Sequence, residues 1–406
     1  MLEIFKEFRE KLDDVMTKAF GHRIVLWGYG YTGQFLEWYA EYYHSLKMDF
    51  VITEEWSSVI PYKFPLFRNS IFDFNYMDVN NSMVWLAIPE DEIVSEKLAA
   101  MNLQKNVDYF NFLEIIYGDN YINNAEVSKN VFWVQKTGLR DIQFMEWLEY
   151  MYDCNLVTAV NNSNYANAKD NHSYRITTQK EIFSILDKCH CNPGKEDAIF
   201  DFGCGKGGAI ITFLDYGFHK VGGVEFEKEL YEIMLLNLNR TGIMPDSDKP
   251  YEITCIHGDA GQCERELDDY NWFYYFDPFG KEIFSKTINN ICESLKRRPR
   301  KIHIININPR YYDLIINSGC FKLTNQFCVS MRQKVVSIFV TEKKFEVKYR
   351  YIPWRENDGE IFFVWSRNKL LWGNTFFWKG KYYSNYRQRY KKTRHGCRRH
   401  TCYLPG

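Results

Sequence analysis

Apolar runs alternate with amphipathic stretches over the first 120 residues of the chain. Apolar residues recur at helical spacing over residues 1–20, which predicts one amphipathic helix. A strand-like run then leads into the glycine turn "GYGYTG" and a second helical stretch, and the further strand-like runs are "MDFVIT" and "SMVWLAIP". Alternation of strands and helices is typical of a parallel sheet covered by helices. We therefore predict an N-terminal Rossmann-like domain over residues 1–120.

A less regular, mainly helical and polar stretch follows. The segment "DIQFMEWLEYMYDC" is amphipathic, and the segment "VNNSNYANAKDNHSY" is a polar loop rich in asparagine. Thr178 stands three residues before Glu181 at the start of an apolar stretch, which is the spacing of a helix capping box. We predict that residues 121–195 form a helical connector and a lid over a site.

The alternation restarts at Ala198 and is clearer than before. Five strand-like segments are separated by helical ones: "AIFDFG", "KVGGVEF", "EITCIHGD", "WFYYFDP" and "KIHIININP". Two later segments, "FKLTNQFCV" and "KVVSIFVTE", are predicted to close the sheet as an antiparallel pair. The pattern predicts a second α/β domain over residues 196–345, with a seven-stranded sheet, followed by an aromatic and basic extension over residues 346–406.

Composition restricts the class of protein. The 406 residues are 46% hydrophobic and 25% charged, which indicates a globular chain with more than one core. The first residues lack the basic start and apolar middle of a signal peptide, and no apolar run is long enough for a membrane span. The 11 cysteines are scattered and are predicted to be reduced thiols. We expect a cytoplasmic protein.

The C-terminal tail differs in charge from the rest of the chain. From Ile361 onward it contains 11 Lys or Arg and no Asp or Glu, whereas the whole chain has a net charge of −1. Bases interleaved with tyrosines can contact nucleic acid, but a short cationic tail without apolar periodicity is more typical of a disordered segment. The tail also holds four metal-ligating side chains whose spacing is tighter than that of zinc sites, so we predict no metal: His395, Cys397, His400 and Cys402.

A glycine-rich turn, "DFGCGKGGA", follows the first strand of the second domain. Its glycines Gly203, Gly205 and Gly208 match the G-x-G-x-x-G pattern of dinucleotide-binding folds, which by itself would also fit NAD. Asp201 stands two residues before the first glycine, where a dinucleotide turn normally has an apolar residue. This acid favours a different adenosine ligand.

Two further strand ends support the same interpretation. Glu225 ends the next strand about 20 residues on, where a carboxylate can accept hydrogen bonds from both ribose hydroxyls. The third strand ends in "HGDA", which places Asp259 and Ala260 where the edge of an adenine would lie. The order of these motifs along the chain fits one adenosine-containing ligand.

With "YYFDPFG" at the end of the fourth strand and Asn308-Pro309 at the end of the fifth, residues 170–345 resemble the class I S-adenosylmethionine-dependent methyltransferases. The resemblance implies that S-adenosylmethionine is the cofactor. It implies that Asp201 and the turn hold the methionine end, Glu225 the ribose, and Asp259 the adenine amino group. The residues to which it gives cofactor contacts are Asp201, Gly203, Cys204, Gly205, Gly207, Glu225, Asp259, Ala260, Asp277 and Pro278.

The remaining site predictions concern the transferred methyl group and the cover of the site. Asp277 would face the methyl group and act as a base toward a hydroxyl or as a hydrogen-bond acceptor for an amine. Tyr174 and Thr178 are candidates to fold over the cofactor. Cys204 and Lys206 are interpreted as filler residues of the turn, neither nucleophile nor base.

The first glycine turn, Gly28 to Gly33, has the context of a Rossmann turn but lacks the matching acid. Thr53 stands where the ribose-binding acid is expected, with Glu54 one place further. The domain resembles small Rossmann-like domains of polysaccharide-biosynthesis proteins. An empty fold that positions a substrate or a partner is favoured over binding of NAD or a nucleotide-sugar.

The sequence thus predicts a methyltransferase that acts on a hydroxyl or amine of a small molecule or saccharide intermediate. A nucleic-acid or protein methyltransferase recruited by the basic tail is the alternative, and a non-catalytic scaffold is the third hypothesis. No residue distinguishes the acceptors, and no pattern indicates an oligomeric state.

Overall fold

A computed structural model describes residues 2–52, 66–67, 81–118, 143–160, 172–243, 249–329, 334–342, 364–366 and 369–371. The chain divides into two compact units, Met1–Lys343 and Lys344–Gly406. Within the second unit the described residues form one antiparallel pair, β13 (Val364–Ser366) with β14 (Lys369–Leu371). Apart from Lys369, the basic residues of the tail lie outside the described residues, as do His395, Cys397, His400 and Cys402, for which no metal is predicted.

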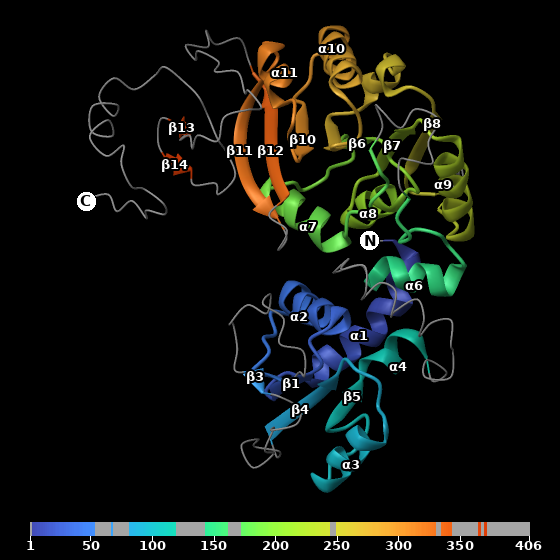
Figure 1. The fold of residues 1–406 in the computed structure, drawn as a ribbon, viewed down its shortest axis with the longest axis vertical. Helices are drawn as coiled ribbons and strands as arrows, with labels where there is room; N and C mark the ends of the chain where they lie inside the picture. Colours follow the sequence, from blue (N-terminus) through green and yellow to red (C-terminus); the bar gives the residue numbers. More distant parts are fainter. Residues whose placement is uncertain are drawn as a thin grey trace, which may run out of the picture. The chain divides into compact units, whose positions relative to one another are not determined.

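Five short strands form a parallel sheet in the first part of the chain (Figure 1). In chain order these are β1 (Arg23–Trp27), β2 (Phe50–Ile52), β3 (Leu66–Phe67), β4 (Ser82–Leu86) and β5 (Tyr109–Asn111). The order across the sheet is β3-β2-β1-β4-β5, so β1 lies at its centre. The predicted parallel α/β pattern is confirmed, and β3 and β5 are additions to it.

Helices cover both faces of this sheet because β1 is apolar at every buried position. The helices are α1 (Lys6–Lys18), preceded by the single turn η1 (Glu3–Phe5), α2 (Tyr31–His44), α3 (Glu92–Ala100) and α4 (Phe112–Tyr117). Ile24 and Leu26 share a buried apolar cluster with α1, α2 and α4. Val25 and Trp27 point the other way and share a cluster with α3.

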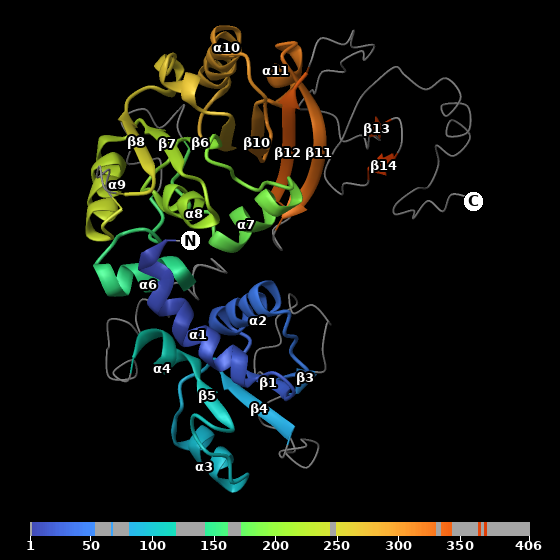
Figure 2. The same cartoon turned by 180° about the vertical axis from the view of Figure 1, so that it is seen from behind.

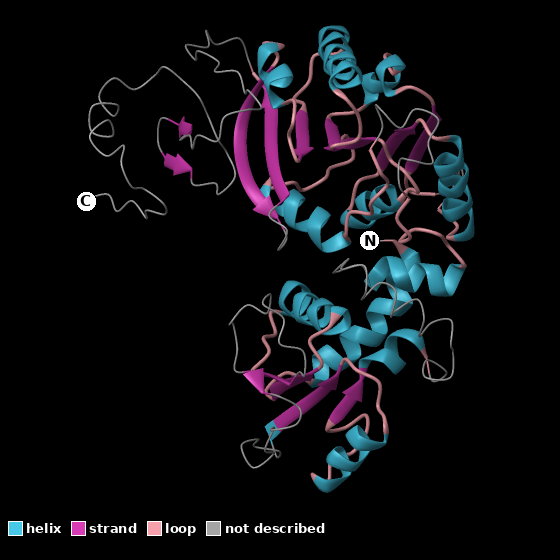
Figure 3. Ribbon diagram, in the orientation of Figure 1, coloured by secondary structure: helices cyan, strands magenta, loops and turns pink. Residues whose placement is uncertain are grey.

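Seven strands form the second sheet, and helices pack around it (Figure 3). In chain order these are β6 (Ala198–Phe202), β7 (Lys220–Glu225), β8 (Glu252–His257), β9 (Trp272–Phe276), β10 (His303–Ile307), β11 (Phe321–Val329) and β12 (Lys334–Thr341). The order across the sheet is β11-β12-β10-β9-β6-β7-β8. Only β12 runs antiparallel to its neighbours, so the predicted sheet with a terminal antiparallel hairpin is confirmed.

The helices of the second region also lie on both faces of their sheet (Figure 2). They are α7 (Gln179–Lys188), α8 (Gly208–Tyr216), α9 (Lys228–Arg240), α10 (Lys281–Arg297) and α11 (Tyr312–Asn317). Ile199 of β6 shares a buried cluster with α7, α8 and α9, whereas Phe200 and Phe202 share another with α10 and α11. The inner strands β6 and β9 are almost entirely apolar because both of their faces are buried, whereas the edge strands β8 and β11 carry exposed polar positions.

The first of these clusters continues from α1 and α2 through α6 (Gln143–Tyr152) to α7 and α8. At its edge Arg9 of α1 forms a buried ion pair with Asp215 of α8, with its two terminal nitrogens 2.6 and 3.0 Å from the carboxylate oxygens. Asp215 also accepts hydrogen bonds from the Leu2 N–H and the Gln179 side chain. Burial opposes the charge of Arg9, but its bonds to Asp215 outweigh burial and raise its pKa. The pair therefore links the N-terminal helix to the second sheet.

Two general properties follow from the described residues. No helix among them combines the length and the apolar character needed to cross a membrane. No group of three or more His, Cys, Asp or Glu side chains in these ranges could hold a metal ion.

Candidate active site

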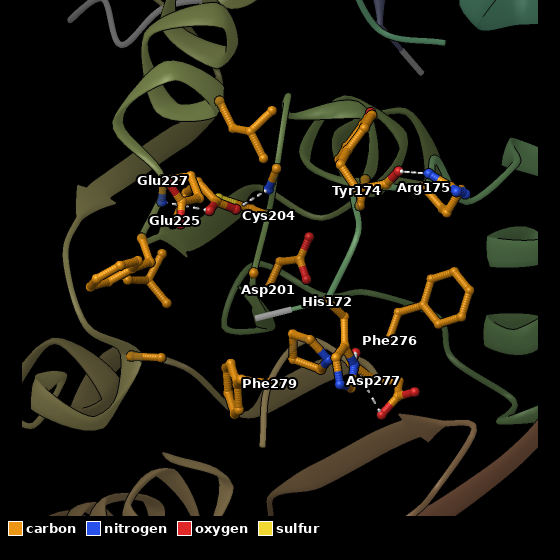
Figure 4. Close-up of a pocket in the computed structure, with 18 of the residues that line it drawn as sticks. His172, Tyr174, Arg175, Asp201, Cys204, Glu225, Glu227, Phe276, Asp277 and Phe279 are labelled. Atoms are coloured by element: carbon orange, nitrogen blue, oxygen red, sulfur yellow. Dashed lines mark hydrogen bonds and ion pairs between the residues drawn. The ribbon is translucent and has the colours of Figure 1, made fainter. Parts of the chain in front are cut away.

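A cavity opens at the carboxyl ends of β6, β7 and β9 (Figure 4). Its empty volume, including the open mouth, is about 920 Å³. In open α/β sheets such a crevice forms where neighbouring strands connect in opposite directions, here between β6 and β9. Ten of the twelve predicted site residues line it: Tyr174, Asp201, Gly203, Cys204, Gly205, Glu225, Asp259, Ala260, Asp277 and Pro278.

The turn after β6 needs glycine because of its backbone and its neighbours. Gly203 and Gly205 have φ of 83° and 54°, in the left-handed region. A Cβ at Gly203 would lie 2.7 Å from the Pro278 ring, and one at Gly205 would lie 2.4 Å from the Tyr174 ring. Both neighbours line the cavity, so the two glycines set its shape. Gly207 lies behind the cavity at the start of α8, against α9.

Asp201 is a buried acid whose carboxylate lines the cavity. It is only 4% exposed, and it points into the cavity near Glu225 (Figure 4). Burial, and then the charge of Glu225, raise the pKa of Asp201 to about 8. In the part of the chain that the structure describes, no group donates a hydrogen bond to its carboxylate. Because a buried carboxylate without a donor is costly, this position favours a ligand with a cationic donor.

Glu225 ties the end of β7 to the glycine turn. One carboxylate oxygen accepts from the Gly205 N–H at 2.8 Å, and the other accepts from the Glu227 N–H at 2.9 Å. Burial raises the pKa of Glu225, although these main-chain bonds oppose the shift. Each carboxylate oxygen can accept a further bond, which leaves two acceptor positions for a pair of ligand hydroxyls.

Asp259 and Ala260 follow β8 and form another wall of the cavity. Oδ1 of Asp259 accepts a hydrogen bond from the Gly261 N–H at 2.8 Å. Asp259 is thereby the N-cap of the short helix η5 (Ala260–Gln262). The second carboxylate oxygen of Asp259 can accept a hydrogen bond from a ligand, and the main chain of the buried Ala260 can also contact that ligand.

At the other end of the cavity, Asp277 lies between two basic side chains. Its φ of 46° is left-handed, and its Oδ2 lies 3.0 Å from Nε of Arg310. The Nδ1 atom of His172 lies 3.5 Å from Oδ1 and donates a short hydrogen bond to the main-chain oxygen of Asp277. Burial raises the pKa of Asp277 more than the charges of His172 and Arg310 lower it.

Sequence reasoning missed both partners of Asp277. His172 lies in the asparagine-rich loop, where no periodic pattern marks it. Arg310 directly follows the Asn308-Pro309 motif, so its position at a strand end was the available signal.

The segment before the cavity is fixed to the glycine turn by polar bonds. The Tyr174 hydroxyl donates to the Leu156 carbonyl at 2.7 Å. Lys206 donates to the Asn155 side chain at 2.7 Å and to the Thr158 carbonyl at 2.9 Å, and it is almost fully buried. The interpretation of Lys206 as a filler residue is therefore wrong, because it anchors this segment.

Two other predicted residues have clear places. Thr178 caps α7 in the predicted capping box, accepting from the Glu181 N–H at 3.2 Å, and it does not line the cavity, whereas the adjacent Thr177 does. The buried thiol of Cys204 lies 3.5 Å from the Met234 sulfur, and burial raises its pKa well above the ordinary value, so it stays protonated.

The first glycine turn is packed differently. A Cβ at Gly28 would lie 2.4 Å from the Ile88 side chain, and one at Gly33 would lie 2.1 Å from the Gly28 carbonyl oxygen. Two residues before Gly28 stands Leu26, which is buried in the core. Thr53 and Glu54, the candidates for a ribose contact, lie outside the described residues.

No family model and no curated protein matches the chain. Among solved structures it resembles precorrin 8w decarboxylase from Methanobacterium thermoautotrophicum, with 18% identity over 42% of this chain and 93% of that one, at a TM-score of 0.31. It also resembles a glycopeptide N-methyltransferase complexed with S-adenosyl-L-methionine, with 10% identity over 41% of this chain and 94% of that one, at a TM-score of 0.32. A third similar structure is an RNA methyltransferase from Salinibacter ruber in complex with S-adenosyl-L-homocysteine, with 12% identity over 43% of this chain and 100% of that one, at a TM-score of 0.29. These similarities are distant, so function is argued from the site itself.

Proposed function

We propose that the chain is an S-adenosylmethionine-dependent methyltransferase that acts on a hydroxyl or amine of a small molecule or saccharide intermediate. The observation that carries the proposal is the buried carboxylate of Asp201, which faces the cavity without a donor from the described residues. Glu225 lies beside it with two acceptor positions. A ligand with an ammonium group and a ribose satisfies both, and S-adenosylmethionine has both groups.

The residues fit the parts of this ligand in the order of the strands. Asp201 and the turn would hold the methionine end, Glu225 the ribose, and Asp259 with Ala260 the adenine. When bound, S-adenosylmethionine supplies an electrophilic methyl group on a positive sulfur. The contribution of the chain is then mainly to orient the acceptor against that methyl group, which lowers the entropic part of the barrier. Asp277 and Pro278 would form this end of the site.

The domain division and the location belong to the same proposal. Residues 1–120 would position the acceptor or a partner, residues 121–195 would connect and cover the site, residues 196–345 would carry out the transfer, and residues 346–406 would form an extension. All the cysteines in the described ranges are free thiols, which supports a reducing, cytoplasmic setting. The alternative function, a nucleic-acid or protein methyltransferase, depends on tail residues that lie outside the described ranges.

Calorimetric titration with S-adenosylhomocysteine tests the proposal. We expect wild type to bind, and Asp201→Asn and Glu225→Gln each to lose roughly 30-fold or more in affinity, which corresponds to about 2 kcal/mol for a buried charged contact. Asp197→Asn is the matched control, because Asp197 lies just before β6, at the opposite end of the strand from the cavity, and accepts bonds from Gly194 and Asn271. Absence of binding to wild type, or equal binding by all four proteins, would contradict the proposal.

A further inference from the structure

His172 lines the cavity at the end where Asp277 lies, and its ring is held through Nδ1 (Figure 4). Nδ1 contacts the main-chain oxygen of Asp277 and faces the carboxylate of the same residue at 3.5 Å. The main-chain N–H of His172 also donates to the Pro278 carbonyl at 3.3 Å. The backbone and the ring of His172 are thus both fixed to the turn after β9.

This contact determines where the imidazole carries its proton. A carbonyl oxygen can only accept, so Nδ1 must be the donor. In the neutral ring the other nitrogen, Nε2, then has a free lone pair. Among the described residues no group hydrogen-bonds to Nε2, although the residue itself lines the cavity. The arrangement is that of a base whose second nitrogen is held by a main-chain carbonyl and faces a neighbouring carboxylate.

We propose that Nε2 of His172 takes the proton of the methyl acceptor and that Asp277 is the residue that positions it. The inference rests on the proposed function, and it moves the role of base from Asp277 to His172. The carboxylate of Asp277 is already engaged by Arg310 at 3.0 Å, which leaves it less free to take a proton than an unpaired ring nitrogen. The charge of Arg310 also opposes the effect of burial on the pKa of Asp277, although burial remains the larger effect.

The proposed step transfers one methyl group to the acceptor and one proton to His172. The acceptor oxygen or nitrogen forms a bond to the methyl carbon while the bond between that carbon and sulfur breaks. The electron pair of the broken bond stays on sulfur, which gives neutral S-adenosylhomocysteine. The proton of the acceptor passes to Nε2, and the resulting imidazolium lies next to the Asp277 carboxylate. The proton then leaves to water through the cavity mouth. The acceptor must therefore be a group that loses a proton on methylation, such as a hydroxyl or an amine.

Nitrogen-15 NMR of histidine-labelled full-length protein, at about pH 8 where an ordinary histidine is neutral, reads the tautomer directly. The His172 signals are assigned by their loss in His172→Gln. We expect the proton on Nδ1 and a bare Nε2. A proton on Nε2 would overturn the inference.

Carbethoxylation by diethylpyrocarbonate, followed by peptide mass spectrometry, tests the role of Asp277. His219 is the matched control, because its ring Nδ1 also contacts a carbonyl, that of Pro250 at 3.1 Å, and the side chain is exposed. In Asp277→Asn we expect the rate at His172 to fall several-fold and the rate at His219 to stay unchanged. Equal rates at His172 in both proteins would remove Asp277 as its positioning residue.

Calorimetry with S-adenosylhomocysteine on the same samples separates the two proposals. If wild type does not bind this ligand, the proposed function fails whatever the state of His172. If it binds and His172 carries its proton on Nε2, only the inference about His172 fails.

Discussion

The two glycine turns share a pattern and a place in their sheets but differ in what surrounds them. Each follows the first strand of its sheet in chain order, β1 or β6, and each opens a helix. Two residues before the first glycine, the first turn has the buried Leu26 and the second has Asp201. The first turn packs against a neighbouring loop and its own backbone, whereas the second packs against side chains that line a cavity. The glycine pattern therefore predicts the turn, and its neighbours decide the chemistry.

Replacing Asp215 should have the largest effect on the free energy of unfolding. The substitution tests whether the two regions that carry these turns fold together. Its carboxylate accepts from Leu2, Arg9 and Gln179. Asp215→Ala leaves Arg9 as a buried charge, so we expect the free energy of unfolding to fall by about 3–5 kcal/mol, measured by urea denaturation.

Asp187→Ala is the exposed counterpart of that change. Asp187 accepts from Tyr42 of the first region at 3.4 Å and from Tyr216 of the second at 2.8 Å. Its loss should lower the free energy of unfolding by only about 1 kcal/mol. Similar effects of the two substitutions would show that the buried pair does not join the regions.

Alanine at one glycine of each turn separates packing from ligand binding. Gly205→Ala strains a left-handed backbone and forces a Cβ into the Tyr174 ring, so it should lower stability by about 1–3 kcal/mol and weaken binding of S-adenosylhomocysteine. Gly33→Ala forces a Cβ against a main-chain oxygen and should cost a similar amount, about 1–3 kcal/mol, without changing that affinity.

Gly242→Ala is the control for strain alone, because Gly242 has a φ of 67° with no atom near the position of a Cβ. It should leave ligand affinity unchanged in calorimetry at a temperature where every variant is folded. Weaker binding by Gly33→Ala would mean that the first turn also contributes to the ligand site.

The last prediction concerns the pH dependence of stability and of ligand binding. In the folded chain burial raises the pKa of Asp201 to about 8, whereas in the unfolded chain the group ionises near its ordinary value of about 4. The folded chain therefore binds more protons between these values, and Asp201 makes stability fall as the pH rises toward 8. Binding of an ammonium group needs the carboxylate, so affinity for S-adenosylhomocysteine should rise with pH by up to about tenfold per unit and level off above pH 8.

Calorimetry across this pH range checks the prediction, with two variants for comparison. Asp201→Asn should remove the rise in affinity. Glu146→Gln should keep it, because burial also raises the pKa of Glu146 to about 8 but Glu146 lies on α6 and does not line the cavity. A rise that survives in Asp201→Asn would assign the titration to another group.

The strands and the carboxylates at their ends were predictable from the sequence. The contacts of the segment before α7 with the site were not. Strands buried on both faces, such as β6, appear in the sequence as apolar runs, and Glu225 and Asp259 are marked by their places at or just after the ends of β7 and β8. The two-residue β3 and the six-residue α11 are too short to produce a pattern. The contact of His172 with Asp277 spans 105 positions and that of Lys206 with Asn155 spans 51, so neither follows from local sequence.

The two ends of the cavity come from different parts of the chain. Asp201 and Glu225 belong to the strands β6 and β7, whereas His172 lies on the segment before α7, outside the sheet. On the proposed assignment, Asp201 and Glu225 bind the cofactor and His172 faces the acceptor. Selection can therefore change the acceptor by mutating a loop while the strands stay as they are, so relatives of this chain can diverge in substrate and keep one cofactor.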